Sequence, residues 1–385
     1  MAEFVFWTCF ALLAYHVILY PALLVAWAAR RPPPVVHTFR MDGAPTVTLI
    51  VPIFNEANVI KKKVENLGQL IYPGGKLEIL LIFDGTTDES VSLARTVKTD
   101  DRISLRVFND NRGKVAVLND AISECRSDIV ALNDASAMLE PEALMRSVAY
   151  FSSSETGVVC PSYALPAGAE AGQEKYWVIQ RKIKAAESRV HSVVGPHGAF
   201  YLFRRVLWAP IAADTINDDF ILPMSIVLKG YRAVYAPEVV AQELENSSPN
   251  QDSKRRVRIA AGNLQQAVRL WKLALPSQGA LAFLFASGKG LRALVPLFAS
   301  VGFVALFFSA LKSPFYAVFL AASVGALVLA GLTAVDTRGR LPKPLAAVGY
   351  FVRGLGSGLL GSLLLLFGWK HRAWQITRGR PNKSH

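Results

Sequence analysis

The sequence predicts an α/β domain with a doubly wound, mainly parallel sheet, joined to transmembrane and interfacial helices. Four continuous apolar runs in the first half are typical of strands buried on both faces, and helical patterns separate them. Apolar segments long enough to cross a bilayer lie at both ends of the chain. The composition agrees, because 52% hydrophobic residues and a mean hydropathy of +0.30 are high for a soluble enzyme.

Strands and helices alternate along the first half of this domain. Apolar runs predict strands at 46–54, 77–85, 103–110 and 128–134. Helical spacing predicts helices at 55–70, 88–100 and 113–125, and Asn55 is able to cap the first of them. Farther along, Asp218 opens another helical pattern, which stops at Gly230 and is followed by a strand. Such alternation favours parallel strands joined by crossover helices.

Residues 1–30 are expected to form an N-terminal transmembrane helix. The stretch 4–29 is almost wholly apolar and is followed by Arg30 and Arg31, whereas a signal peptide carries its positive charge first. By the positive-inside rule, the chain that follows lies in the cytoplasm. The sequence therefore predicts a cytoplasmic domain over 40–275 in a multi-pass protein of the cell inner (plasma) membrane.

The C-terminal region, 276–385, is expected to return to the membrane. Spans of about 291–311 and 315–335 are separated only by "KSP", which favours a hairpin with both outer ends in the cytoplasm. The glycine-rich stretch 345–369 is expected to be re-entrant or interfacial and to leave the basic tail in the cytoplasm. A fourth crossing is the alternative. The apolar run 280–288 is too short to span and is expected in the interface.

The net charge restricts the classes of partner. At +13, with a pI near 9.7, the chain suits anionic partners such as acidic lipid headgroups and phosphorylated substrates. Nucleic acid is not expected, because the sequence contains no zinc-finger, RNP-type or basic-zipper motif. Cys9, Cys125 and Cys160 are too far apart for a metal motif or a disulfide framework, which favours a reducing compartment.

Polar side chains follow each of the four predicted strands. They are Asn55 and Glu56, then Asp84, then Asn111 and Lys114, and finally Asp134. Ligands of doubly wound sheets bind beyond these carboxyl ends, so we expect a nucleotide site here, although a single Asp after a strand is commonly a turn or cap residue. No G-x-x-x-x-G-K-[ST] loop or G-x-G-x-x-G fingerprint occurs. The phosphates would therefore be neutralised by a metal and basic side chains.

Several motifs, in order, resemble those of membrane-bound family 2 glycosyltransferases, the superfamily that includes cellulose, chitin and hyaluronan synthases. The motifs are "VPIFNE", "FDGTTDES", "NRGKVAVLN", "NDAS" at the D-x-D position, "EKYWVIQRKIKAAES", "GPHGAFYLFRR", "INDDF" and "RRVRIAAGN". The sequence departs from the family pattern at Phe54, Phe83, Thr86, Ser136, Arg255 and Ile259. Ile259 stands where polymerising members have Trp and cannot stack on a sugar ring, which argues against processive synthesis.

The resemblance implies a GT-A fold and an inverting, metal-dependent hexosyltransferase. The implied donor is a nucleotide-diphosphate sugar, in the first place a UDP-sugar, and the implied cofactor is Mg2+ or Mn2+. The acceptor would be a lipid or a growing saccharide of the cell envelope or an exopolysaccharide, and polysaccharide-assembly proteins are further expected partners. The alternatives are a nucleotidyltransferase and a non-catalytic partner of a polysaccharide synthesis or export complex.

The resemblance also implies roles for individual residues. Asp134 would hold the metal, with Ser136 either bound to a metal water or offering a neutral oxygen to the metal, and Asp219 of the pair Asp218–Asp219 would be the catalytic base. The implied nucleotide-binding residues are Pro52, Phe54, Glu56, Asp84, Lys114, Asp134, Arg255, Arg256 and Arg258, and the implied acceptor-binding residues are His197, Gly198 and Trp177. Structural alternatives remain: a solvated Lys114, an N-cap pair at 218–219, a structural His197 and an arginine face against anionic lipid.

Overall fold

The computed structural model describes residues 1–34, 43–166, 171–244, 249–335 and 341–368. Within it the chain forms two compact units. The sheet unit consists of Trp27–Ala169 and Gln180–Asn246, and the helical unit consists of Met1–Ala26, Glu170–Ile179 and Ser247–His385.

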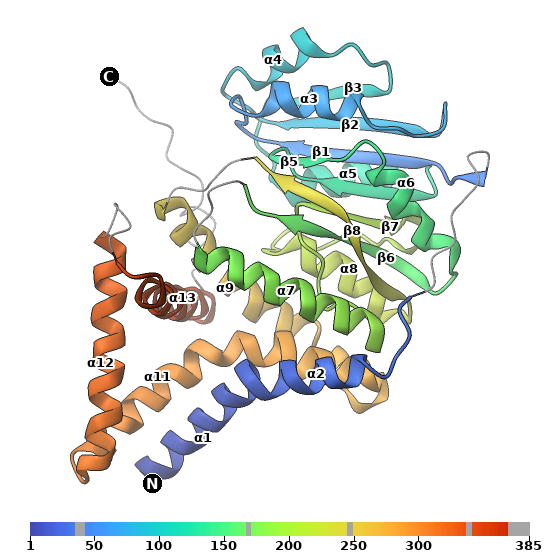
Figure 1. Cartoon of the computed structure of the whole chain (residues 1–385). Coiled ribbons are helices and arrows are strands. Elements are labelled where there is room, and N and C mark those ends of the chain that lie inside the picture. The colour runs from blue at the N-terminus through green and yellow to red at the C-terminus, as the bar shows by residue number, and fades with distance from the viewer. Residues whose placement is uncertain (35–42, 167–170, 245–248, 336–340, 369–385) are drawn as a thin grey trace, which may run out of the picture. The chain divides into compact units, whose positions relative to one another are not determined.

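The sheet unit contains one eight-stranded sheet in the described residues, with the order β3-β2-β1-β4-β7-β6-β8-β5 (Figure 1). The strands are β1 (Val47–Ile53), β2 (Leu77–Asp84), β3 (Ile103–Phe108), β4 (Ile129–Asn133), β5 (Ala137–Leu139), β6 (Thr156–Ala164), β7 (Phe200–Arg204) and β8 (Arg232–Glu243). The first four are parallel, as predicted, and Val47 pairs with both Leu77 and Ile129. β7 is antiparallel to both β4 and β6, so the whole sheet is mixed.

Continuous apolar sequence explains the parallel half of the sheet. Every residue of β4 is buried, and β1 is buried except at Pro52, so neither strand offers a face to water. The helices of this unit are α3 (Ile60–Gly68), α4 (Ser90–Val97), α5 (Lys114–Glu124), α6 (Ala143–Val148), most of α7 (Ala171–Val190) and α8 (Asp218–Leu228). Parallel strands joined by such crossovers bring the carboxyl ends of β1, β2 and β4 to one edge.

The expected helix cap at Asn55 is wrong. α3 begins only at Ile60, and Asn55 lies in the left-handed region at φ 56°. Its side-chain oxygen accepts a hydrogen bond from the amide of Thr87 at 2.8 Å. The neighbouring amide of Ala57 donates to Asp88 at 3.0 Å. The loop after β1 is therefore held by the loop after β2, and Asn supplies a turn that few other residues tolerate.

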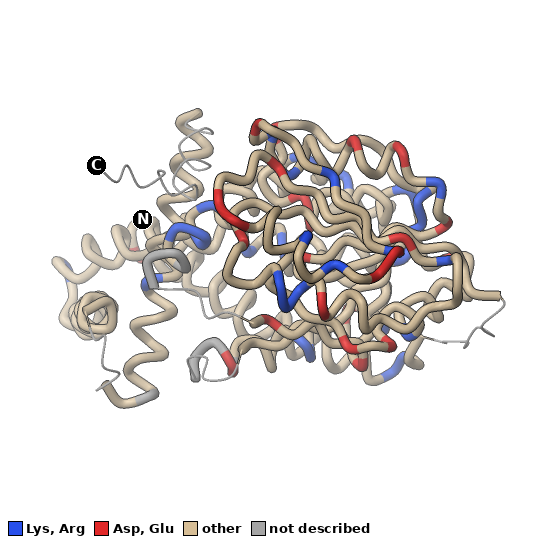
Figure 2. The backbone as a smooth tube through the Cα atoms, turned by 90° about the horizontal axis from the view of Figure 1, so that it is seen from above, with Lys and Arg blue, Asp and Glu red and all other residues tan. Residues whose placement is uncertain are grey.

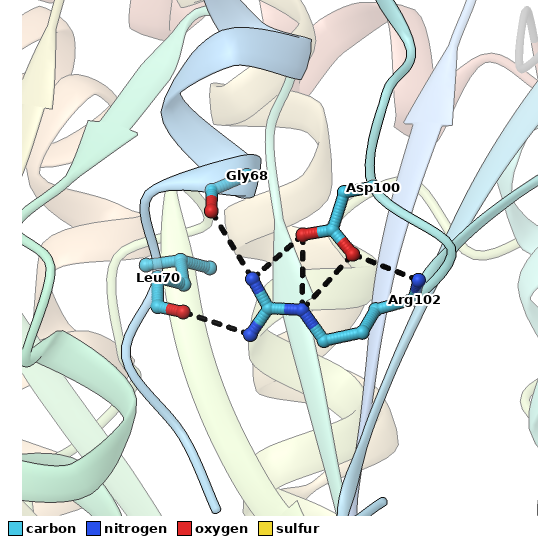
Figure 3. Close-up of polar contacts among 4 residues, drawn as sticks. All are labelled: Gly68, Leu70, Asp100 and Arg102. Atoms are coloured by element: carbon cyan, nitrogen blue, oxygen red, sulfur yellow. Dashed lines mark hydrogen bonds and ion pairs between the residues drawn. The ribbon is translucent and has the colours of Figure 1, made fainter. Parts of the chain in front are cut away.

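A guanidinium group closes the C-terminal end of α3 (Figure 3). Arg102, just before β3, donates to the carbonyls of Leu70 at 2.8 Å and Gly68 at 3.1 Å. Asp100 binds the same guanidinium at 2.6 Å, and this hydrogen bond lowers the pKa of the Asp100 carboxyl. Carbonyls that α3 leaves without helical partners are thus satisfied by a charged donor.

In its described residues, the helical unit contains four helices that are long and apolar enough to cross a membrane. They cover Ala2–Ala28, Ala280–Ala310, Pro314–Val335 and Pro344–Leu366. Figure 2 shows few charged residues along these helices, and α12 (Pro314–Val335) has none. The run 280–288 is not a separate helix, because α10 (Ala280–Leu284) continues through a π-helical turn, η7 (Phe285–Gly290), into α11 (Leu291–Ala310), and its place in the interface stays a prediction.

A second π-helical turn interrupts the N-terminal helix and contacts the first. η1 (Tyr15–Leu19) joins α1 (Ala2–Ala14) to α2 (Tyr20–Ala28). The Tyr15 hydroxyl lies 2.7 Å from the Ser287 hydroxyl, and His16 Nδ1 lies 3.0 Å from the Ser287 carbonyl oxygen. A carbonyl released by one π turn is therefore bound by a polar side chain of the other.

Glycines of α13 (Lys343–Leu366) are contact points within the helical unit. A Cβ on Gly361 would lie 2.3 Å from the Val257 carbonyl oxygen of α9 (Pro249–Arg269), and one on Gly358 would lie 2.7 Å from Pro296. Small residues allow this close approach between helices. α13 is one unbroken helix, and its interfacial or crossing placement stays a prediction. The basic tail from residue 369 onward lies outside the described residues.

We predict that Gly361→Leu destabilises the helical unit, because the new side chain must push α13 away from α9. The expected loss is about 1–3 kcal/mol in the free energy of unfolding, measured on heating or by denaturant in detergent. Gly356→Leu is the matched control, since nothing lies within 4 Å of a Cβ at that position. Equal loss in both variants would show that the α9 contact is not the cause.

Candidate active site

One ammonium group forms ion pairs with two carboxylates that are far apart in the sequence, at the carboxyl edge of the sheet. Lys114 is the first residue of α5, and its Nζ lies 3.2 Å from Asp134 Oδ1 and 3.4 Å from Asp218 Oδ2. Burial lowers the pKa of Lys114, but the charges of Asp134, Asp218 and Asp219 outweigh it and raise the pKa overall. Lys114 is thus charged and paired, and the alternative of a solvated lysine is wrong.

Asp134 follows β4 and remains within reach of solvent. Its amide donates to the Ala199 carbonyl at 3.0 Å, which fixes the backbone, while about 39% of its side chain is exposed. Ser136, two residues later, accepts a hydrogen bond from the Leu244 amide through its carbonyl oxygen at 3.1 Å. Asp134 is therefore a fixed carboxylate that a ligand can reach.

The donor set near Asp134 fits a cation that arrives with its substrate. In the described residues, no group of three or more His, Cys, Asp or Glu side chains is arranged to hold a metal ion. Mg2+ usually takes one or two protein carboxylates and completes its shell with waters and phosphate oxygens. Asp134, with Ser136 two residues away, meets this lower requirement.

Asp218 and Asp219 open α8 but do not cap it. Asn217 occupies the N-cap position, and both Asp residues lie within the first turn, so the alternative of an N-cap pair is wrong. Asp218 is buried, with 7% of its surface exposed, and among the described residues its Oδ2 has no hydrogen-bond partner apart from the ion pair with Lys114. Asp219 is half-buried, and a Cβ on Gly198 would lie 2.7 Å from its Oδ2. The structure thus brings the acceptor-side residue Gly198 against the expected base.

Tyr201 is a site residue that the sequence analysis missed. It lies on β7 opposite Leu132, is 1% exposed, and its hydroxyl has no hydrogen-bond partner in the part of the chain that the structure describes. Burial, and then the charges of Asp218, Asp219 and Asp134, raise the pKa of this hydroxyl. A buried hydroxyl without a hydrogen-bond partner among the described residues, under the influence of these carboxylates, is a group that a ligand or water atom could satisfy. Its only sequence signal was a tyrosine between the apolar residues Phe200 and Leu202.

His197 has a fixed ring in this structure. It stacks on Tyr163 with the ring centroids 3.8 Å apart, and its Nδ1 accepts a hydrogen bond from the Ala199 amide at 3.1 Å. The proton of the neutral ring is therefore on Nε2. These contacts fit a structural histidine, and its binding of acceptor stays a prediction.

Asp84 shapes the loop that leads into α5. Its two carboxylate oxygens accept the amides of Arg112 at 2.7 Å and Gly113 at 2.8 Å. Gly113 has φ 91° and is the N-cap of α5, so Asp84 sets the position of Lys114. Asp84 is 4% exposed, and a direct contact with a nucleoside stays a prediction.

The other expected nucleotide residues of the sheet unit lie around the end of β1. Phe54 is 40% exposed directly after the strand, an unusual position for an apolar ring. Pro52 and Glu56 are half-buried, and the Glu56 amide donates to the Ser90 hydroxyl at 2.8 Å. Phe54 therefore offers an accessible aromatic face at the edge where ligands bind, whereas the nucleotide contacts of Pro52 and Glu56 stay predictions.

Trp177 and the three arginines belong to the helical unit. Trp177 packs edge-to-face on Tyr176 at 5.3 Å. On α9, Arg256 lies over the Tyr350 ring at 4.0 Å, Arg255 is exposed, and Arg258 is half-buried with its Nε lacking a hydrogen-bond partner. Their roles toward nucleotide, acceptor or lipid stay predictions.

Comparison with known proteins places this geometry in a family. Residues 44–262 match the family described as "Glycosyltransferase like family 2". Poly-β-1,6-N-acetyl-D-glucosamine synthase from Staphylococcus aureus is 24% identical over 60% of this chain, and β-monoglucosyldiacylglycerol synthase from Synechocystis sp. is 26% identical over 59%. The chain spans 57% and 50% of the length of these two relatives.

A solved structure is similar over nearly the whole chain. The mannosyltransferase PcManGT from Pyrobaculum calidifontis, in complex with GDP-Man and Mn2+, has a TM-score of 0.75 at 22% sequence identity and covers 96% of this chain and 99% of its own. This likeness confirms the predicted GT-A fold. Because the family match includes β1, the Asp134 loop, the Asp218–Asp219 pair and most of α9, the chain belongs to glycosyltransferase family 2.

Proposed function

We propose that this chain is a membrane-embedded inverting glycosyltransferase that moves a sugar from a nucleotide-diphosphate sugar to a lipid or saccharide acceptor. The observation that carries the proposal is the ion-pair cluster of Lys114, Asp134 and Asp218, with Asp219 beside it, at the carboxyl edge of the sheet. It gives one carboxylate for the diphosphate side and another for the acceptor side, as inverting transfer requires.

The relatives support the substrate classes. One is named for a polysaccharide and another for a glycolipid, so both kinds of acceptor occur among proteins similar to this chain. The GDP-Man and Mn2+ bound to PcManGT support a nucleotide-sugar donor and a divalent cation, although a UDP-sugar is the donor we propose first. Arg30 and Arg31, which follow the first apolar helix, support a cytoplasmic sheet unit at the inner membrane.

On the donor side, Asp134 would hold the cation together with the diphosphate. When bound, Mg2+ or Mn2+ neutralises the charge that develops on the diphosphate as the sugar bond breaks. Lys114, now paired with Asp134 and Asp218, is placed to donate to a phosphate oxygen. The exposed Phe54 ring provides a surface on which a nucleobase can stack.

On the acceptor side, Asp219 would remove the proton from the attacking hydroxyl. It lies in the first turn of α8, where the helix dipole stabilises a carboxylate. Asp218 is paired with Lys114 on the donor side, and we therefore assign the role of base to Asp219. Inversion follows because attack and departure occur on opposite faces of the sugar in one displacement.

A panel of nucleotide sugars tests the proposed function. Purified protein with Mg2+ or Mn2+ is expected to release UDP or GDP from one of them and to label a lipid or saccharide acceptor. Release of pyrophosphate with nucleotide transfer would show a nucleotidyltransferase instead. Complete absence of turnover with every donor would favour a non-catalytic partner of a polysaccharide synthesis or export complex.

The metal assignment rests on Asp134. We predict that Asp134→Ala abolishes transfer and lowers donor affinity, whereas Ser136→Asp keeps or raises metal affinity because it adds a second carboxylate. Turnover and Mn2+ binding are measured for both variants. Near wild-type turnover of Asp134→Ala in the presence of the cation would exclude the assignment.

The base assignment separates two neighbouring carboxylates. Asp219→Asn is expected to lose about 10²–10⁴-fold in transfer rate, the usual contribution of general base catalysis, while nucleotide-sugar binding is retained. Asp218→Asn should cost less, because Asp218 contacts Lys114 rather than the acceptor. The reverse order of effects would exchange the two roles.

Gly198 is expected to control the position of the base. Gly198→Ala places a Cβ 2.7 Å from Asp219 Oδ2, so the carboxylate must shift. A displacement near 1 Å at a reacting group lowers the reaction rate on the order of 10²-fold. We therefore expect kcat to fall by that factor while donor affinity is unchanged. Gly74→Ala is the control, because nothing lies within 4 Å of its added Cβ. Full activity of Gly198→Ala would show that Asp219 does not need its present position.

A further inference from the structure

A lysine lies entirely inside the sheet unit, beneath the loop that carries Asp134. Lys63 of α3 is 0% exposed. Its Nζ donates to Asn133 Oδ1 and to the Ala137 carbonyl. A buried ammonium group is costly unless it is well paired, so its presence at a core position needs a reason. Both of its partners flank Asp134 and Ser136.

The contacts of Lys63 extend to the acceptor side of the site. Asn133, held by Lys63, donates through Nδ2 to the Ala199 carbonyl at 2.7 Å. The same carbonyl accepts the Asp134 amide at 3.0 Å. Ala199 follows Gly198, which lies against Asp219. One continuous chain of contacts therefore joins Lys63 to the backbone of the donor-side carboxylate and to the neighbour of the base.

The attachment of α3 to the sheet does not require Lys63. Asn66, one turn later, donates to the Leu139 carbonyl at 2.7 Å and accepts the Leu139 amide at 2.9 Å. Ile60, Val64 and Leu67 bury the apolar face of the helix. An aliphatic residue at position 63 would serve packing as well, so the hydrogen bonds to Asn133 and Ala137 are what distinguish the lysine.

We propose that Lys63 is a positioning residue that fixes the 133–137 loop, and through Asn133 and Ala199 sets Asp134 relative to Gly198 and Asp219. The catalytic meaning of this inference rests on the proposed function, whereas the fixing of the 133–137 loop by Lys63 is a structural claim. Burial lowers the pKa of Lys63, the charges of Asp134 and Glu243 raise it, and the net result is a pKa of about 7.

Lys63→Met and Asn66→Ala separate positioning from general stability. Each removes a contact between α3 and the β4–β5 region, but only Lys63 contacts Asn133 and Ala137. In the full chain, hydrogen exchange is expected to become faster for 133–137 and 197–201 in Lys63→Met, because Asn133 is no longer held and so no longer fixes the Ala199 carbonyl that accepts the Asp134 amide. In Asn66→Ala, faster exchange is expected at Leu139 and not at 197–201.

Cation binding provides the second measurement. Mn2+ binding in the presence of UDP, followed by electron paramagnetic resonance, is expected to weaken about 10–100-fold in Lys63→Met, the usual effect of losing support behind a metal ligand. Asn66→Ala is expected to bind as wild type. With kinetics measured beside it, Lys63→Met should lower kcat as well as donor affinity.

A double variant guards against a trivial loss of folding. Lys63→Met with Asn133→Leu replaces the Lys63–Asn133 pair by apolar groups, so no side-chain amide is left without the lysine, although the Ala137 carbonyl loses its side-chain donors and the link to Ala199 is not restored. We expect a melting temperature above that of Lys63→Met but still weak Mn2+ binding. Wild-type Mn2+ affinity in the stable double variant, or unchanged exchange at 197–201 in Lys63→Met, would overturn the proposal. If the wild-type chain itself bound no Mn2+, the proposed metal site would be wrong. The exchange data alone would then decide whether Lys63 fixes the 133–137 loop.

Discussion

Carboxylates repel one another in a partly buried site, and the edge of this sheet holds three of them near a single ammonium group. Lys114 pairs with Asp134 and Asp218, and its raised pKa reflects the charge of Asp219 as well. Much of the local architecture serves the position of this one cation. Asp84 binds the amides before α5, and Gly113 adopts a left-handed conformation so that the helix starts at Lys114. The three carboxylates outnumber the ammonium group of Lys114, so this edge of the sheet keeps a negative charge that suits a cation.

Short-range patterns predicted the parallel half of the fold and the edge where the polar groups meet. Continuous apolar runs predicted β1 to β4. The rule that ligands bind beyond strand ends predicted that Asp134 and Lys114 lie at the same edge of the sheet. The antiparallel β7 was not predicted, because pairing of β7 with β4 depends on contacts between residues about 70 positions apart, such as Asn133 with Phe200. Tyr201 was missed for the same reason.

Lys63 shows a different kind of omission. It stands in "IKKKV", where three lysines look alike, but it lies three residues after Ile60 and four before Leu67, on the buried face of α3. The helical spacing therefore indicated a buried position for Lys63. It was not predicted, because lysine side chains are usually expected to be in solvent. The prediction of a helix cap at Asn55 was wrong for a different reason. Asn is suited both to helix caps and to left-handed turns, and here it adopts the left-handed turn. In the helical unit, length and hydropathy sufficed to identify long apolar helices, whereas the partners of Gly358 and Gly361 depend on tertiary packing.

The paired π turns of the helical unit have a consequence for the register of its first helix. A π turn contains one more residue than the α turn it replaces, so removal of a single residue from η1 would restore a regular helix. Every side chain before the deletion would then rotate by about 100° around the axis, since an α-helix has about 3.6 residues per turn. Cys9, whose Cβ lies 3.1 Å from the position of a Cβ on Gly302, would turn away from α11. The rotation of the whole N-terminal segment about its helix axis is thus set by one extra residue. The contacts of Tyr15 and His16 with Ser287 hold that residue's turn in place.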